Sequence, residues 1–389
     1  MDVSHLLDEL NDAQREAVTA GDHHTLVLAG AGSGKTRVLI HRLAWLIQVE
    51  HVSPLGILAV TFTNKAAGEM RQRAGDLLQV STRPLWIGTF HGIAHRLLRM
   101  HWKEAGLPET FQILDSEDQL RLLRRIIRDE GMDESQWPAR QAQWFINARK
   151  DEGERPDRIE HLDHPVTAAW VHIYKLYQDY CNRGGLVDFA ELLLRAHELW
   201  LEHYRRRLQH LLVDEFQDTN AIQYAWVRML AGDTGRVFVV GDDDQSIYGW
   251  RGARVENVHH FERDFPDVQT VRLEQNYRST GIILDAANAL IAHNQARMGK
   301  SLWTAGERGH PIALYAAFNE QDEARYVVER IQQWLDEGRR ADDCAILYRT
   351  TAQSRLFEEY LLRESIPYRV YGGLRFFERK KLEAPLTCL

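Results

Sequence analysis

Short apolar segments, each followed by small or polar residues and then by a helical pattern, recur through two parts of the chain. After Leu26–Ala29, for example, Leu39, Leu43 and Leu46 repeat at helical spacing. Short continuous apolar runs are typical of strands that are buried on both faces. The alternation of strand and helix therefore predicts an α/β fold built on a parallel sheet. Further strands are expected at Ile57–Phe62, from Trp86, and at His210–Val213, Val237–Val240 and Val271–Leu273.

Between about residues 90 and 206 the pattern is helical almost throughout. Because this block interrupts the alternation of strand and helix, we predict an all-helical insertion at 90–206 within an α/β lobe formed by 1–89 and 207–278. A partial second α/β lobe is expected at 279–376, followed by a divergent tail at 377–389. Its predicted elements are a helix at Asp322–Leu335 and strands at Pro311–Ala317, Cys344–Tyr348 and Tyr368–Tyr371.

Composition and charge narrow the class of protein. Apolar residues make up 44% and charged residues 27% of the 389 residues, which is ordinary for a soluble globular chain. No apolar run reaches the ~20 residues of a membrane span, so no membrane partner is expected. The three cysteines are far apart and form no metal or disulfide pattern, which makes a reducing cytoplasm the expected location. With a net charge of −8, nucleic-acid binding would rest on local contacts and base stacking.

The segment Ala29–Thr36 carries the clearest chemistry. Glycines at 30, 32 and 34 allow the backbone N–H groups to surround phosphate oxygens, and the start of the following helix adds its dipole. Lys35 can reach the outer phosphates and Thr36 can hold Mg²⁺. Since a strand precedes the segment and a helix follows, we favour a nucleoside triphosphate site over an ordinary glycine-rich turn.

Carboxylates follow a second predicted strand. His210–Val213 runs directly into Asp214 and Glu215. With a phosphate loop upstream, this pair indicates triphosphate hydrolysis, in which one carboxylate serves hydrated Mg²⁺ and the next orients or deprotonates water. Likewise, Arg278 follows the strand Val271–Leu273 and can supply positive charge to the transferring phosphoryl group.

The loop after Val237–Val240 combines an amide with two aromatic residues. Gln245 is placed to contact the γ-phosphate, while Tyr248 and Trp250 would not ordinarily be exposed together on a surface loop. A platform on which bases stack explains both aromatics. The sequence therefore predicts a triphosphate sensor about five residues from a base-stacking element.

Other candidates are ambiguous from the residues alone. The amide of Gln14 can read the adenine edge, although a plain surface helix explains its segment as well. His91 is by default structural, and Phe189 fits either a core position or a ligand contact. Asn64 is expected at the carboxyl end of a parallel strand, where ligands bind in such sheets.

Taken together, these motifs resemble superfamily 1A DNA helicases of the UvrD, Rep and PcrA type. The resemblance covers nearly the whole chain. It rests on Leu10–Val18, Ala29–Thr36, Val60–Met70, Ile87–Arg96, Leu212–Asn220, Val239–Ala253, Leu273–Thr280 and Ile366–Arg379. It implies two RecA-like lobes, the first with a helical insertion, and a 3′→5′ translocase on single-stranded DNA. Such a motor unwinds duplex DNA with ATP and Mg²⁺, in DNA repair and replication, with partners among excision- and mismatch-repair proteins.

The resemblance also implies a role for each matching residue. Lys35, Glu215, Gln245 and Arg278 would be catalytic, with Glu215 as the base. Thr36 and Asp214 would position Mg²⁺. The ATP-binding set would be Gln14, Ala29, Gly30, Ala31, Gly32, Ser33, Gly34, Lys35, Thr36, Arg37, Tyr277 and Arg278. The DNA-binding set would be Phe62, Asn64, His91, Phe189, Tyr248, Trp250 and Arg251.

The family pattern continues further than this chain does. No residues after Arg379 match the two remaining helicase motifs, one of which supplies a second arginine to the γ-phosphate. We therefore expect a carboxyl-terminally truncated fragment that binds ATP and DNA but unwinds duplex weakly or not at all. Two alternatives stay open at this point: a helicase–nuclease subunit, and an ATP-dependent DNA-binding module without productive turnover.

Overall fold

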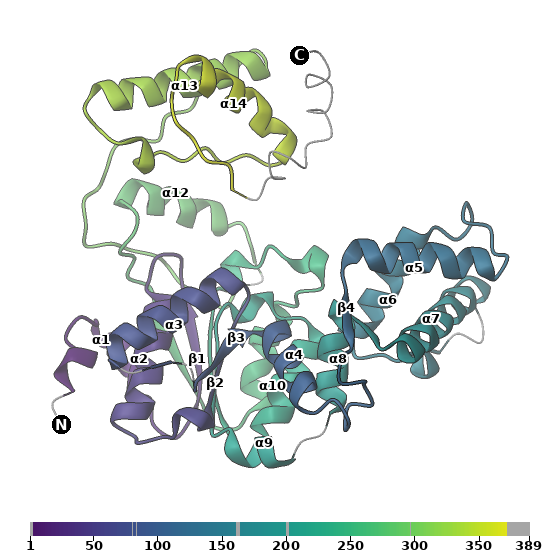
Figure 1. Cartoon of the computed structure of the whole chain (residues 1–389). Helices are drawn as coiled ribbons and strands as arrows, with labels where there is room; N and C mark the ends of the chain where they lie inside the picture. Colours follow the sequence, from purple (N-terminus) through teal and green to yellow (C-terminus); the bar gives the residue numbers. More distant parts are fainter. Residues whose placement is uncertain are drawn as a thin grey trace. The chain divides into compact units, whose positions relative to one another are not determined.

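The computed structural model describes residues 3–79, 81–82, 84–160, 164–199, 202–295 and 297–371. The chain forms two compact units, Met1–His310 and Pro311–Leu389 (Figure 1). The division falls after His310, whereas the domain boundary expected from the sequence falls after residue 278. Residues beyond 278 pack with the first unit because the Trp303 backbone oxygen accepts a hydrogen bond from the backbone nitrogen of Asn276, and Arg297 donates to both carboxylate oxygens of Asp244.

A six-stranded sheet forms the centre of the first unit. Its strand order is β3-β2-β6-β7-β1-β8, and every neighbouring pair is parallel. The predicted parallel α/β fold is therefore confirmed. The strands are β1 (His24–Ala29), β2 (Ile57–Thr61), β3 (Trp86–Thr89), β6 (His210–Val213), β7 (Arg236–Gly241) and β8 (Val268–Leu273).

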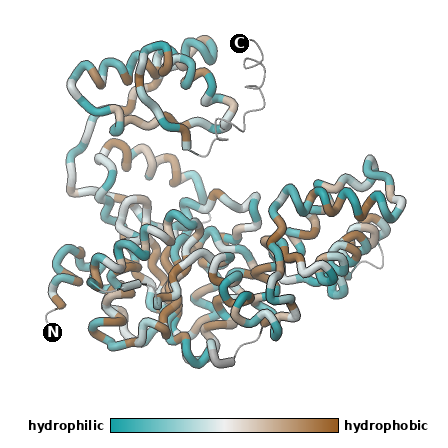
Figure 2. The backbone as a smooth tube through the Cα atoms, in the orientation of Figure 1, coloured by the Kyte–Doolittle hydropathy of each residue, from teal (hydrophilic) through white to brown (hydrophobic). Residues whose placement is uncertain are grey.

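Helices cover both faces of this sheet, which explains why its strands are apolar without alternation. Leu26 and Leu28 of β1 pack into one core, and Val27 and Ala29 pack into the other. Figure 2 shows the apolar positions gathered along the strands. One core contains α4 (Phe90–Met100), α8 (Phe189–Glu198), α10 (Ala221–Ala231) and α11 (Glu256–Asp264). The other contains α1 (Asp12–Val18), α2 (Lys35–Gln48) and α3 (Asn64–Leu78).

The insertion after β3 has its own small core, and it is not entirely helical. A two-stranded parallel sheet joins β4 (Gln112–Leu114) to β5 (Leu186–Asp188), so the prediction of an all-helical insertion was wrong in this respect. Each strand has only three residues, too few to produce a recognisable apolar run. The remaining helices are α5 (Ser116–Asp129), α6 (Ala139–Asp151), α7 (Pro165–Gly184) and α9 (Glu202–Arg207). Side chains from α5, α6 and α7 make up the separate core.

Beyond β8 the described chain is helical or irregular. The elements are α12 (Gly281–Ile291) in the first unit, and α13 (Glu320–Asp336) and α14 (Ser354–Arg363) in the second. The helix predicted at Asp322–Leu335 is thus confirmed as α13. In contrast, Pro311–Ala317, Cys344–Tyr348 and Tyr368–Tyr371 are not strands. A strand requires a hydrogen-bonded neighbour, and in the described part of this unit these segments pair with none, leaving Leu314 and Leu347 exposed. The predicted tail at 377–389 lies outside the described residues.

Among the described helices, we find none whose length and apolar character would let it pass through a lipid bilayer.

Candidate nucleotide and DNA site

The glycine-rich loop lies between β1 and α2, as the sequence indicates. Gly32 and Gly34 have φ values of +68° and +91°, a region that side chains other than glycine rarely adopt. Space is also limited there, because a Cβ on Gly34 would lie 2.7 Å from Gln14 Nε2. Ser33 Oγ donates to the backbone oxygen of Gly30 at 2.7 Å and closes the turn. Ala31 lies within this turn, and Lys35 and Thr36 form the start of α2, next to the backbone donors of the loop.

Lys35 is held among carboxylates at the start of α2. Its Nζ lies 3.4 Å from Glu215 Oε2 and 4.0 Å from Asp242 Oδ2. The side chain is 11% exposed, and within the described chain the Nζ makes no hydrogen bond. A buried ammonium group without a hydrogen-bonded partner is costly, and phosphate oxygens would satisfy it.

The segment after β6 concentrates negative charge beside this lysine. Asp214 is buried, and burial together with repulsion from Glu215 raises its pKa to about 7. Burial and the same repulsion raise the pKa of Asp218 to about 6. Glu215 itself has a φ of +50°, a strained conformation for a residue with a side chain. Such a cluster favours a cation, and Asp214 with Thr36 offers the oxygen ligands that Mg²⁺ prefers.

A chain of amide hydrogen bonds links these carboxylates to the loop after β7. Gln217 Nε2 donates to Glu215 Oε2 at 2.9 Å, and Gln217 Oε1 accepts from the backbone nitrogen of Asp242 at 2.9 Å. Gln245 Nε2 in turn donates to Asp242 Oδ2. The sequence reasoning gave Gln217 no role. Its position in the sequence could have indicated one, because Gln217 lies between acidic residues just after a strand. An amide there can donate to a carboxylate and accept from a second group at the same time.

On the side of the expected adenine pocket, Gln14 is fully engaged within the protein. Its Oε1 accepts from the backbone nitrogen of Asn11, its Nε2 donates to the backbone oxygen of Ser33 at 2.9 Å, and the residue is buried. Asn11 Nδ2 donates to the Tyr277 hydroxyl at 2.7 Å, which places the exposed Tyr277 ring beside Gln14's helix. Arg37 is half exposed and donates from Nη1 to the backbone oxygen of Glu9.

Asn276, which the sequence reasoning missed, packs against the phosphate loop. Its Nδ2 donates to the backbone oxygen of Ala31, and its Oδ1 accepts from the backbone nitrogen of Arg278 at 2.8 Å. A Cβ on Gly32 would meet the Cβ of Arg278 at 2.7 Å. Asn276 therefore fixes Arg278 next to the loop, while the Arg278 side chain remains exposed.

Aromatic side chains gather near the ends of β2 and β7. Phe62 and Tyr248 stack, with ring centroids 5.3 Å apart and an angle of 21° between their planes. The Arg251 guanidinium lies 5.3 Å from the Tyr248 ring centroid and 4.6 Å from that of Trp250. Trp250 is 73% exposed. These four residues form a continuous stacked surface, called the aromatic ladder below.

A second aromatic contact joins α4 to α8. The His91 ring meets the Phe189 ring edge to face at 6.2 Å, and Phe189 is half exposed. Burial lowers the pKa of His91 to about 4, so the ring is neutral at pH 7. Asn64 is exposed at the first position of α3, where the preceding Thr63 caps the helix.

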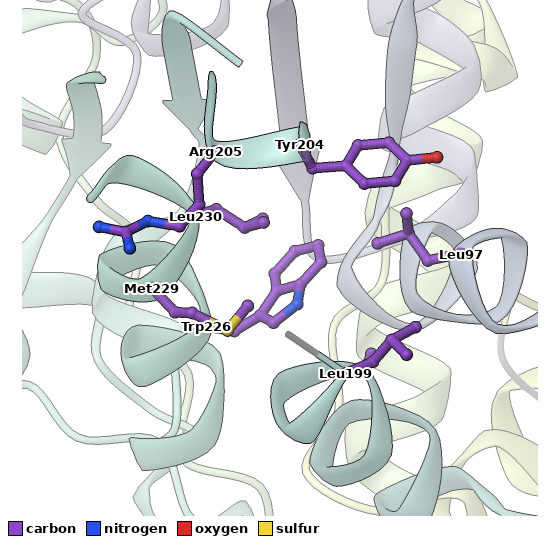
Figure 3. Close-up of a pocket in the computed structure, with 8 residues that line it drawn as sticks. Leu97, Leu199, Tyr204, Arg205, Trp226, Met229 and Leu230 are labelled. Atoms are coloured by element: carbon purple, nitrogen blue, oxygen red, sulfur yellow. The ribbon is translucent and has the colours of Figure 1, made fainter. Parts of the chain in front are cut away.

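A pocket elsewhere in the first unit belongs to packing. It lies between α4, α8, α9 and α10, where Trp226 is surrounded by apolar side chains such as Leu97 and Leu199 (Figure 3). It has room for no more than about one water molecule, and none of its lining residues is a predicted site residue.

Comparison with known proteins gives a consistent result. Residues 10–266 match the UvrD/REP helicase N-terminal domain, and residues 271–389 match the UvrD-like helicase C-terminal domain. The chain is 64% identical to DNA helicase II of Escherichia coli and 58% identical to that of Haemophilus influenzae, each across 100% of this chain and 55% of the relative. It is 41% identical to the ATP-dependent DNA helicase PcrA of Staphylococcus epidermidis, over 99% of this chain and 54% of that protein. The chain thus spans about 55% of the length of these helicases.

Proposed function

Because this chain belongs to the UvrD/REP family of helicases, we propose that it binds ATP and single-stranded DNA and couples ATP hydrolysis to 3′→5′ movement along the strand. Its proposed domains are the first RecA-like lobe at 1–89 and 207–278, the insertion at 90–206 and part of a second lobe at 279–376. DNA repair and replication in the cytoplasm are the proposed setting, with excision- and mismatch-repair proteins as partners.

One observation supports this proposal above the others. The hydrogen-bonded series Glu215–Gln217–Asp242–Gln245 begins beside Lys35 and ends three residues before Tyr248, which stacks on Phe62. A movement of Glu215 can therefore reach the aromatic ladder through these hydrogen bonds and then along the backbone from Gln245 to Tyr248. Nucleotide hydrolysis and DNA stacking are thus connected within a single sheet edge.

For the nucleotide, we assign binding to the loop Gly30–Gly34 and to Lys35, whose ammonium group is aimed into the acidic site without a hydrogen-bonded partner in the described chain. Tyr277 and Arg37 flank the adenine, which Gln14 reads after exchanging its bond to Ser33. Thr36 and Asp214 would hold Mg²⁺, which when bound neutralises charge on the β and γ phosphates.

In the proposed reaction, Glu215 accepts the proton of the attacking water. Gln217 fixes this carboxylate through its Nε2, and the strained backbone at Glu215 directs the side chain toward Lys35. Gln245 contacts the γ-phosphate, and Arg278 stabilises the charge that develops on the transferring group. A positioned base of this kind contributes ~10²–10⁴-fold to the rate.

For DNA, we assign stacking of bases to Phe62, Tyr248, Trp250 and Phe189, with His91, Asn64 and Arg251 beside them. Arg251 already lies over two of these rings, so it can add a cation–π contact without competing with stacking. The neutral state of His91 suits a position against bases rather than phosphates.

The test is DNA-stimulated ATP hydrolysis by the whole chain and by Glu215→Gln. Hydrolysis by the parent chain and its loss in Glu215→Gln, with ATP binding retained, would support the motor function. Equal rates in both would leave only an ATP-dependent DNA-binding module.

Unwinding requires a separate assay. Strand separation on duplexes with a 3′ or a 5′ tail tests the polarity, and we expect weak or absent unwinding by this chain. Full unwinding would contradict that expectation, and unwinding from the 5′ tail would contradict the polarity.

A further inference from the structure

Three consecutive aspartates after β7 surround a buried lysine from a distant part of the chain. Lys300 Nζ lies 2.7 Å from Asp242 Oδ1, 2.5 Å from Asp243 Oδ1 and 3.0 Å from Asp244 Oδ2. The lysine side chain is only 2% exposed. The carboxylate oxygens lie close enough together to hold a metal ion, but in this structure the ammonium group of Lys300 lies among them. The cluster is therefore an internal ion-pair site.

Neighbours of Lys300 strengthen the same attachment. Arg297 donates from Nε and Nη2 to the two oxygens of Asp244, at 2.7 and 2.8 Å. The backbone nitrogen of Met298 donates to Asp243 Oδ2 at 2.9 Å. All three carboxylates thus pair with Lys300, and Asp243 and Asp244 each receive a further hydrogen bond from residues 297–298.

The other end of this segment attaches to the phosphate loop. Trp303 accepts a hydrogen bond from the backbone nitrogen of Asn276 at 2.7 Å, and Asn276 donates to Ala31 in the loop. Leu302 packs so closely on Gly30 that a Cβ there would lie 2.0 Å from a Leu302 methyl carbon. We call Arg297–Trp303 the strap, because it contacts the loop after β7 at one end and the phosphate loop at the other.

We propose that the strap positions Gln245 for its contact with the γ-phosphate, and that Lys300 is the positioning residue. Asp242 connects the two residues, because its Oδ1 pairs with Lys300 while its Oδ2 accepts from Gln245. Removing Lys300 would leave Asp242 free to turn toward Lys35, 4.0 Å away, and Gln245 would lose its fixed acceptor. The buried carboxylates of Asp242 and Asp243 and the partly buried carboxylate of Asp244 would also repel one another without the ammonium group.

This proposal rests on the proposed function, so its first test does not use hydrolysis. Hydrogen exchange of a peptide covering residues 241–248 is measured in the nucleotide-free whole chain and in Lys300→Met. We expect exchange to accelerate ~10-fold or more in the variant, because the loop opens locally without its anchor. Peptides from β1 should exchange as before. Unchanged exchange at 241–248 would overturn the proposal, whether or not the chain hydrolyses ATP.

Hydrolysis provides the second test. In Lys300→Met, kcat for DNA-stimulated hydrolysis should fall ~10–100-fold, since small displacements of a catalytic group cost this much. The KM for ATP should change far less, and Lys300→Arg should recover part of the rate. The decisive comparison is a cycle with Gln245→Ala: if Lys300 acts through Gln245, Lys300→Met causes little further loss in that background. Equal losses in both backgrounds would overturn the proposal.

Two controls separate positioning from general instability. Arg297→Gln removes the contacts to Asp244 and one bond to the backbone oxygen of Lys300, but it leaves the Lys300 ammonium group in place. It should therefore raise exchange at 241–248 less than Lys300→Met and should keep the protein folded even where Lys300→Met does not. Lys175→Met removes a lysine that pairs with Asp157 in the insertion, and it should alter neither readout. Slow exchange at 241–248 in Arg297→Gln, identical to that of the parent chain, would contradict a role for the strap.

Discussion

Phe62 stacks on Tyr248, although the two residues follow different strands of the sheet. Phe62 comes directly after β2, and Tyr248 lies in the loop after β7 that also carries Gln245. Because β6 separates β2 from β7 in the sheet, the contact bridges the strand whose end carries Asp214 and Glu215. The aromatic ladder therefore joins the two strands that flank the strand carrying the proposed catalytic carboxylates.

The exposed end of the aromatic ladder gives the first prediction. Trp250→Ala should weaken single-stranded DNA affinity by ~1–3 kcal/mol, because a base loses its stacking partner. The melting temperature should hardly change, since Trp250 is 73% exposed. Affinity is measured by fluorescence anisotropy with a labelled oligonucleotide.

A matched control exists for this substitution. Trp144 on α6 is also 73% exposed but lies outside the predicted DNA-binding set. Trp144→Ala should leave DNA affinity unchanged. Equal losses in the two variants, or a Trp250→Ala variant that loses stability and keeps its affinity, would contradict the stacking role.

Gln217 gives a prediction that the motif alone does not make. Gln217→Glu keeps an acceptor for the Asp242 nitrogen but places a carboxylate where the Nε2 donor faced Glu215. We expect kcat for ATP hydrolysis to fall by ~10-fold or more, as Glu215 is pushed away from its position. Gln217→Ala should instead cost ~1–3 kcal/mol of stability by leaving the Asp242 nitrogen unpaired.

The comparison for Gln217 is another buried glutamine. Gln178 is buried in the insertion and donates to Asn182 and Glu191, both of which also belong to the insertion. Gln178→Ala should reduce stability with no effect on kcat. A Gln217→Glu variant with normal turnover would show that Glu215 does not depend on this amide.

Asp214 leads to a prediction about pH. Its pKa in the folded protein, about 7, lies above the ordinary value near 4 of the unfolded chain. The folded state therefore binds this proton more tightly than the unfolded chain does. The free energy of unfolding falls as pH rises from about 4 to about 7, and this contribution stays constant above that. Asp214→Asn removes this loss, so the variant should gain melting temperature over the parent chain between pH 5.5 and 7.5, measured without nucleotide or Mg²⁺.

Ligand reverses the order of stability at this site. With Mg²⁺ and a non-hydrolysable ATP analogue, the parent chain should be stabilised by binding while Asp214→Asn gains little. ATP hydrolysis by the variant should be nearly abolished. A melting-temperature difference that stays constant from pH 5.5 to 7.5 would contradict the assignment of the raised pKa to Asp214.

The sheet was predictable because its signal is local. In the six-stranded sheet, each strand is an apolar run that helices cover on both faces. The apolar runs and the helical patterns between them were therefore enough to predict a parallel α/β fold. The same signal failed at Pro311–Ala317 and Cys344–Tyr348, where the apolar residues are present but no neighbouring strand pairs with them. It also missed β4 and β5, whose pairing joins segments more than 70 residues apart.

The residues of the candidate site also form two groups: those that the local sequence indicates and those that only the structure reveals. That Lys35, Glu215 and Gln245 lie at one edge of the sheet was predictable, because each follows a strand end and parallel strands bring those ends together. Lys300 was not predictable, because nothing in its local sequence indicates a partner 58 residues earlier, at Asp242. Asn276 and Gln217 lie inside the quoted motifs, but only the structure shows which groups their amides join.

The last prediction concerns a buried lysine in the insertion. Lys150 on α6 is fully buried, with its Nζ 2.6 Å from Asp188 Oδ2 and 3.0 Å from Glu191 Oε2. Burial alone would lower the pKa of Lys150, but these two carboxylates outweigh burial and hold the pKa above its ordinary value. Asp188 also caps α8, the helix that begins with Phe189. Lys150→Met would leave both carboxylates buried with less positive charge, at a cost of ~3–5 kcal/mol in the free energy of unfolding.

The adjacent residue supplies the control for that prediction. Arg149 on the same helix pairs at 2.9 Å with Glu154, which lies beyond the helix end. Both side chains are partly exposed, so Arg149→Met should cost no more than ~1 kcal/mol. Denaturant unfolding followed by tryptophan fluorescence compares the two. If the loss in Lys150→Met comes from uncompensated charge, adding Asp188→Asn should recover stability, because it removes one of the stranded carboxylates and keeps an oxygen to cap α8. A double variant less stable than Lys150→Met alone would show instead that Lys150 stabilises the insertion through packing. In that case packing, and not the ion pairs of Lys150, would fix the position of α8 and Phe189.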